Sequence, residues 1–243
     1  MTTKSTPAAA ALALALTLAI SACGGQDDAA RVSHAANNAA PAAPDAAPAP
    51  ATETGAAFTP PTLSDGPDAC FKAIAAHLGA ETKVSEILAF YSAGSAINPD
   101  ASKPQGQMTT CTVKYQDPDD PRKLAGTSMD MRSGQFRAPR RQEIMVMGNP
   151  ADFDLEDHLI PLSQVDAAAL TGIMDAQEKA LGGVYASYAW TGVRLSPPGA
   201  FSDVHTLRLD VTGRLASNDI KTSGYASVSV DGKKITSDHL LPR

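Results

Sequence analysis

Hydrophobic and polar residues alternate through much of the second half of the chain, with the period of two that is typical of β-strands. The clearest run lies within residues 206–215, where Leu207, Leu209 and Val211 alternate with Thr206, Arg208 and Asp210. Similar runs predict strands at residues 184–195, 220–230 and 235–240. The pair Asp231-Gly232 separates the last two runs and is a strong hairpin signal.

Three other segments carry apolar residues three or four positions apart, which is the spacing of one face of an α-helix. These apolar sets are Cys70, Phe71, Ile74 and Leu78, then Val84, Ile87, Leu88 and Tyr91, and finally Leu170, Ile173, Met174 and Leu181. Gly79, Gly94 and Gly182 follow the three sets and indicate where each helix ends. Ser163 and Asp166 have the spacing of a capping box before the third helix.

Three further strands are indicated between the second and third predicted helices. Their alternating residues are Cys111, Val113 and Tyr115, then Thr127, Met129 and Met131, then Ile144 and Val146. The order helix, helix, three strands, helix, four strands predicts an α+β fold with helices packed on an antiparallel sheet. The pattern leaves open one continuous domain or two tandem halves, at residues 65–147 and 160–240.

This order of elements resembles that of tandem helix-plus-sheet proteins such as the beta-lactamase inhibitor proteins and PepSY-type modules. The resemblance is one of architecture and rests on the helix and strand order above. Many lipoproteins of such a plan inhibit envelope-attacking hydrolases, give immunity to them or act as assembly factors. The resemblance therefore implies a protein-binding module.

The first 22 residues have the features of a secretory signal, with Lys4 in a short charged region and an apolar run that ends at Ile20. That run is shorter than the ~20 residues that a membrane-spanning helix needs. Ile20-Ser21-Ala22-Cys23 resembles a bacterial lipobox. The resemblance implies cleavage of residues 1–22 and acylation of Cys23, whose fatty chains would hold the protein at the lipid bilayer.

Residues 23–62 consist mainly of alanine and proline with scattered polar residues and very few large apolar side chains. Such a segment cannot bury enough surface to offset its chain entropy, so we expect a disordered tether. A globular domain is expected at residues 63–243. Gly24 and Gly25 stand where aspartate would favour retention in the inner membrane. The lipoprotein resemblance therefore implies an outer-membrane location, facing the periplasm or the cell surface.

The chain has 243 residues, with 20 Lys+Arg against 26 Asp+Glu and a formal net charge of −6. Its length excludes a large multi-domain enzyme. The acidic balance argues against nucleic acid as a partner, because nucleic-acid-binding proteins carry a basic surface.

Two cysteines besides Cys23 lie on predicted apolar faces, Cys70 on a helix and Cys111 on a strand. In an oxidising compartment, a helix packed on the sheet would bring them together, so we expect a disulfide bond. The alternative is a pair of buried free thiols.

Catalytic and metal-binding signatures are missing from the sequence. It contains no Gly-x-Ser-x-Gly elbow, no phosphate-binding glycine loop and no histidines paired at helical spacing. Ser217-Asn218-Asp219 resembles a penicillin-binding-protein motif, but we interpret these residues as a turn between strands. The acidic residues at 152–157 lack the glycine and the distal glutamate of a calcium loop. We therefore name no catalytic residue, metal ligand or cofactor.

Positive charge is concentrated in Arg132, Arg137, Arg140 and Arg141. Arginine suits desolvated interfaces and bidentate carboxylate binding, so these four are candidate contacts for an acidic envelope or secreted protein. The alternative is that they protect an edge strand from aggregation.

The sequence thus predicts a membrane-anchored envelope lipoprotein that binds a protein, as an inhibitor or immunity protein against an envelope-targeting hydrolase. Two alternatives stay open. One is a cell-envelope hydrolase or carbohydrate-modifying enzyme, and the other is a structural or assembly lipoprotein.

Overall fold

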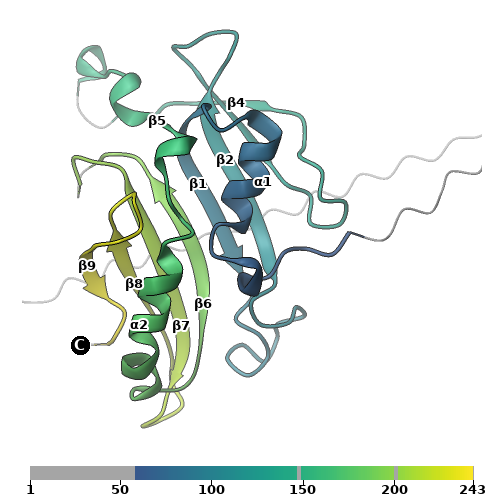
Figure 1. Cartoon of the computed structure of the whole chain (residues 1–243), viewed down its shortest axis with the longest axis vertical. Coiled ribbons are helices and arrows are strands. Elements are labelled where there is room, and N and C mark those ends of the chain that lie inside the picture. The colour runs from purple at the N-terminus through teal and green to yellow at the C-terminus, as the bar shows by residue number, and fades with distance from the viewer. Residues whose placement is uncertain (1–57, 147–148, 200–201, 243) are drawn as a thin grey trace, which may run out of the picture. The chain divides into compact units, whose positions relative to one another are not determined.

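The computed structural model describes residues 58–146, 149–199 and 202–242, and they form an α+β fold. Nine strands make one antiparallel sheet in the order β4-β3-β2-β1-β6-β7-β8-β9, with β5 paired to β1 (Figure 1). The strands are β1 Lys83–Tyr91, β2 Met108–Gln116, β3 Leu124–Ser128, β4 Arg140–Gln142, β5 Ile160–Pro161, β6 Tyr185–Ser196, β7 Thr206–Leu215, β8 Lys221–Val228 and β9 Ile235–His239. The α-helices are α1 Ala69–Leu78 and α2 Leu170–Gly182. The predicted fold class is confirmed.

The sheet consists of two units of the same plan. In each unit one helix is followed by a run of antiparallel strands, β1 to β4 after α1 and β6 to β9 after α2. The first strands of the two units pair with each other, with Ile87 opposite Leu195 and Ala89 opposite Val193. The two arrangements that the sequence left open are therefore combined, because both halves share one continuous sheet.

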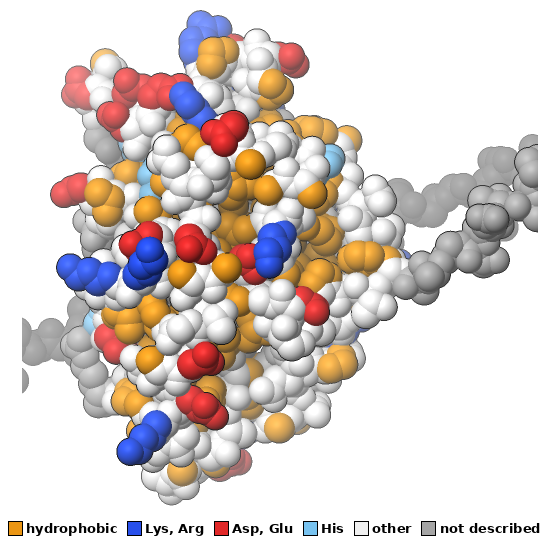
Figure 2. Space-filling model, in the orientation of Figure 1, with side chains coloured by type: hydrophobic (Ala, Val, Ile, Leu, Met, Phe, Trp, Pro, Cys, Tyr) orange, Lys and Arg blue, Asp and Glu red, His pale blue; other side chains and the backbone are white. Residues whose placement is uncertain are grey.

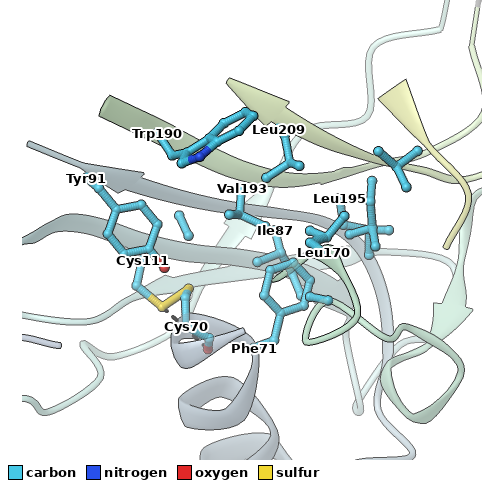
Figure 3. Packing of buried hydrophobic residues seen from close by; sticks show 14 of the residues in the cluster. Cys70, Phe71, Ile87, Tyr91, Cys111, Leu170, Trp190, Val193, Leu195 and Leu209 are labelled. Carbon is cyan, nitrogen blue, oxygen red and sulfur yellow. Dashed lines mark hydrogen bonds between the residues drawn. A yellow bond between two sulfur atoms is a disulfide. The ribbon is translucent and has the colours of Figure 1, made fainter. Parts of the chain in front are cut away.

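Both helices lie on the same face of the sheet, as Figure 1 shows, and the core fills the space between them and the strands. Cys70 and Phe71 of α1 and Leu170 of α2 point towards the strand residues (Figure 3). The core is continuous across both units, and its fully buried members include Ile74, Ile87, Val193, Leu195, Leu207 and Leu209. Hydrophobic side chains also gather between α1 and the segment at residues 162–168 that leads into α2, on the face that Figure 2 shows.

Residues 83–91 form a strand, so the helix predicted there is wrong. Val84, Ile87 and Tyr91 are buried on the face of the sheet that the helices cover. A β-bulge between Val84 and Glu86 breaks the period of two. Leu88, on the opposite face, is also apolar. Because of the bulge and the apolar residues on both faces, the apolar positions of this strand fall three or four residues apart, as they do in a helix.

The strand predicted at Ile144 and Val146 is also wrong, because the edge strand β4 lies just before them at Arg140–Gln142. Ile144 instead packs on a small second cluster with Leu124, Leu155 and Leu159. This cluster fastens the connector between β4 and β5 to the sheet.

Two other predicted boundaries shift. β3 ends at Ser128, so Met129 forms only an isolated bridge and Met131 lies in the turn that follows. Ser163 lies in a short 3-10 helix, Leu162–Gln164, and does not cap α2. Asp166 Oδ1 accepts a hydrogen bond from the Ala169 backbone N–H at 3.2 Å, in the turn just before α2.

The folded domain makes contacts before residue 63. The Pro61 carbonyl accepts a hydrogen bond from the Met108 backbone N–H at 2.8 Å, and Phe58 packs against the core. The predicted signal peptide, Cys23 and the predicted tether as far as residue 57 lie outside the described residues. In the part that is described, none of the helices has the length and hydropathy needed to span a bilayer.

Candidate functional site

The face of the sheet opposite the helices carries the polar half of each alternating strand. Strand pairing places Leu88 beside Arg194 and Gly192 beside Asp210, so β1, β6 and β7 present one continuous row. We call this surface the open face and define it by Glu86, Leu88, Phe90, Thr112, Lys114, Arg137, Arg140, Arg194, Arg208, Asp210, Thr212, Ser223 and Tyr225. All of these side chains are at least partly exposed, and several are charged.

A cluster of two arginines and one aspartate lies at the centre of the open face. Asp210 Oδ1 accepts hydrogen bonds from Arg194 Nη2 and from Arg208 Nε, each at 2.8 Å. The Arg208 guanidinium lies 3.8 Å from the centre of the Tyr225 ring, and the Arg194 guanidinium lies 5.8 Å from that of Phe90. Both guanidiniums are therefore held by a carboxylate and flanked by an aromatic ring.

The backbone of β6 makes room for this cluster. A β-bulge between Trp190 and Gly192 realigns the strand, and Gly192 comes opposite Asp210. A side chain at Gly192 would collide with the carboxylate, because its Cβ would lie 2.6 Å from Asp210 Oδ2. Thr191, Thr212 and Ser223 continue the polar row through hydroxyl contacts of 3.1 and 3.2 Å.

Two hollows lie side by side on the open face. One, of about 320 Å³, is lined by the arginine–aspartate cluster and its two aromatic rings. The other, of about 420 Å³, is lined by Glu86, Leu88, Lys114, Arg137 and Arg140 among others. Their linings hold five cationic and two anionic side chains, so the open face is positive in a chain of net charge −6.

The four arginines predicted as partner contacts do not form one patch. Arg137 and Arg140 line the larger hollow, and Arg137 also pairs with Asp130 at 3.3 Å. Arg132 lies in the turn after β3. A hydrogen bond from its backbone N–H, and to a smaller extent one from the Arg137 guanidinium, lowers the pKa of the Asp130 carboxyl. Arg141 lies opposite Ala125 in the strand register, so it faces the other side of the sheet from Arg140. Only two of the four thus belong to the open face.

The central residues of the open face were not singled out by sequence reasoning. Arg208 and Asp210 appeared as the polar positions of the cleanest strand, but nothing in that pattern distinguishes a site from a solvated face. Arg194 of β6 and Tyr225 of β8 lie beside them through pairing with β7, and Phe90 joins them through the pairing of β6 with β1, which is distant in the sequence.

The predicted disulfide bond is confirmed. Cys70 and Cys111 are joined with an S–S distance of 2.05 Å and lie fully within the core (Figure 3). The bond ties α1 to β2 on the helical face, so it supports the sheet from the side opposite the open face.

The acidic connector serves the structure. Glu156 accepts hydrogen bonds from Lys83 at 2.5 Å and from Gln116 at 2.7 Å, and these contacts lower its pKa. Across the described ranges, no group of three or more His, Cys, Asp or Glu side chains could hold a metal ion. Ser217 and Asn218 lie in the turn between β7 and β8, where Asn218 Oδ1 accepts from the Ile220 backbone N–H.

The comparisons with known proteins give no family. No protein-family model matches the chain, and no match is found among curated proteins or among solved structures.

Proposed function

We propose that this chain is an acylated envelope protein whose domain binds a protein partner through the open face. The observation that carries the proposal is the positive charge of that face, whose hollows are lined by five cationic and two anionic side chains. A charged surface that opposes the sign of the whole chain favours an acidic partner, because complementary fields speed encounter and align the two proteins.

The composition of the open face supports protein binding. Arginine and tyrosine are enriched among the residues that contribute most to protein interfaces, and both are grouped here at the centre of the sheet. The strands on which they lie are fixed by backbone pairing and by the core beneath them. A rigid surface loses little conformational entropy when a partner docks.

Anchoring through Cys23 is the second part of the proposal, and it rests on the lipobox resemblance. We expect radiolabelled palmitate to be incorporated into the native chain and the protein to sediment with outer membranes. Cys23→Ser should lose the label and leave the outer-membrane fraction. A native chain that stays unlabelled and free of membranes would overturn this part.

The biological role that we propose is inhibition of an envelope-targeting hydrolase, or immunity to it. The test is capture of partners from detergent-solubilised envelopes by the tagged full-length protein, with identification by mass spectrometry. Thr112→Trp/Ser223→Trp adds bulk to the open face and should abolish capture. Lys72→Trp/Asp175→Trp places two tryptophans at exposed helix positions instead and should leave capture intact.

The identity of the captured protein then decides the role. A stoichiometric hydrolase supports inhibition or immunity, whereas outer-membrane assembly components would replace that role with a structural one. Equal capture by both tryptophan variants would overturn binding through the open face.

A further inference from the structure

We propose that the Arg194–Asp210–Arg208 cluster binds an aspartate or glutamate side chain from an acidic loop of the partner protein. This inference rests on the proposed function and names the chemistry that the open face recognises. It concerns a site at the centre of the smaller hollow, between the Phe90 and Tyr225 rings.

The first argument is the unused hydrogen-bonding capacity of the two arginines. Asp210 engages Nε of Arg208 and Nη2 of Arg194. Among the described residues, both Nη atoms of Arg208 and Nη1 of Arg194 have no acceptor. The guanidinium fork matches a carboxylate, and its orientation here is fixed before any partner arrives.

The second argument is charge. Two guanidiniums share one carboxylate, so the cluster keeps a formal charge of +1. Arg194 and Arg208 side chains are only 25% and 35% exposed, and Asp210 is 15% exposed. A second carboxylate would therefore meet cations that are already partly desolvated, where electrostatic attraction is stronger than at a fully exposed surface.

The third argument is incomplete satisfaction of the cluster itself. Asp210 Oδ2 and Arg194 Nε are shielded from solvent and have no hydrogen-bond partner among the described residues. Buried polar atoms are normally paired, and exceptions concentrate where a site serves something other than stability. A bound carboxylate only accepts hydrogen bonds, so it can pair with Arg194 Nε but leaves Asp210 Oδ2 unpaired. The unpaired Nε–H is the part of this observation that supports the proposal.

A protein loop fits this site better than an isolated small anion does. The smaller hollow adjoins the larger one, because Leu88 in one lining pairs directly with Arg194 in the other. Lys114, Arg137 and Arg140 extend the positive charge across the sheet. An acidic loop lying along the open face can reach both hollows, with its central carboxylate on the arginine pair.

The test is a nuclear magnetic resonance titration of the full-length protein, isotopically labelled in arginine and held in detergent micelles. The probe is an acetylated hexapeptide of alternating glutamate and glycine, and its control is the same peptide with glutamine in place of glutamate. We expect the glutamate peptide to shift the Nε–Hε resonances of Arg194 and Arg208 and the glutamine peptide to leave them unchanged.

Variants make the assignment specific. Arg194→Gln/Arg208→Gln should weaken glutamate-peptide binding by roughly tenfold or more, the change that ~1.4 kcal/mol produces. Arg208→Lys keeps the charge, so the fold is retained, but it loses the planar fork and should still weaken binding several-fold. Arg122→Gln is the matched control, because Arg122 is 84% exposed and pairs with Asp120 away from the open face.

The outcomes separate the two proposals. If the native protein binds both peptides equally, or if the arginine variants bind like the native protein, the carboxylate assignment is overturned. Should Thr112→Trp/Ser223→Trp still abolish partner capture in that case, binding through the open face stands. Undiminished capture by the tryptophan variant overturns the proposed function instead, whatever the peptide does.

Discussion

A Cβ atom at Gly192 would lie 2.6 Å from Oδ2 of Asp210, across the pair formed by β6 and β7. The same Cβ would lie 3.2 Å from the Phe90 ring. The lack of a side chain at one position thus lets a carboxylate and an aromatic ring pack closely together. The geometry of the arginine pair depends on that space, because Asp210 is the acceptor that orients both guanidiniums.

Gly192→Ala should therefore displace the Asp210 carboxylate. We expect a loss of unfolding free energy of about 1–3 kcal/mol, as in other overpacked sites, and weaker binding of the acidic peptide. Thermal unfolding and the peptide titration measure the two effects. Gly172→Ala in α2 is the control, since its Cβ meets nothing within 4 Å, and it should be neutral or stabilising. Two variants of equal stability and equal affinity would contradict the role of Gly192.

Arg140 and Arg141 offer a comparison between neighbouring residues of one edge strand. Arg140 lines the larger hollow on the open face, whereas Arg141 lies on the opposite side. Arg140→Glu should weaken partner capture, because it reverses a charge within the proposed interface. Arg141→Glu makes the same change outside it and should capture like the native protein. Quantitative pull-downs measure this, and equal losses in both variants would show that the strand edge, rather than its open side, contacts the partner.

The disulfide bond should contribute strongly to stability. It closes a loop with a sequence separation of 41, for which the loop-entropy model gives about 4 kcal/mol. Cys70→Ala/Cys111→Ala should lose much of this amount in urea unfolding. Reductant should destabilise the native protein but leave the double variant unchanged. If reductant lowered the stability of both proteins equally, its effect would not come from this bond.

The seam between β1 and β6 should make the two units unfold together. Leu195 is fully buried opposite Ile87, so Leu195→Ala should cost about 2–5 kcal/mol and leave a single unfolding transition. Hydrogen exchange should show the same loss of protection in β2 and β8. Val204→Ala is the control, because Val204 is 65% exposed. Two separate transitions would mean that the halves are independent domains.

His205 should make the stability of the domain depend on pH. Burial is the main cause that lowers the pKa of His205 below 6.5, while its Nε2 lies 3.2 Å from the His158 carbonyl. As the pH falls below about 6.5, the unfolded chain takes up a proton on this ring before the folded chain does. Stability is therefore lost as the pH falls from 6.5 through the lower folded pKa. His205→Gln should reduce this loss between pH 7.5 and pH 5.5 in urea unfolding, and an unchanged pH dependence would contradict the argument.

Much of the sheet could be predicted because its strands bury one face and carry polar residues on the other. In β7 the alternation of Leu207 and Leu209 with Arg208 and Asp210 survives unbroken, and its predicted bounds match the structure. β1 could not be predicted in this way. Its bulge moves Val84 out of the period set by Ile87 and later residues, and Leu88 and Phe90 on its open side are also apolar.

The candidate site could be predicted only in part, for a related reason. Arg137 and Arg140 attract notice because they are close together in the sequence. Arg194 and Arg208 are not, and they share Asp210 only because β6 and β7 pair in one register. The alternation of a single strand indicates which of its sides faces solvent, but not which residues of the other strands lie beside it.

Site-specific photocrosslinking tests the central claim, that the open face binds the partner, most directly. A photoreactive p-benzoylphenylalanine in place of Ser223 would lie on the open face, and the same residue in place of Asp175 would lie exposed on α2. In envelopes of cells that express the full-length protein, we predict a single crosslinked partner from position 223 and none from position 175. The same partner crosslinked from position 175 but not from position 223 would contradict the account, because binding would then occur through the helical face.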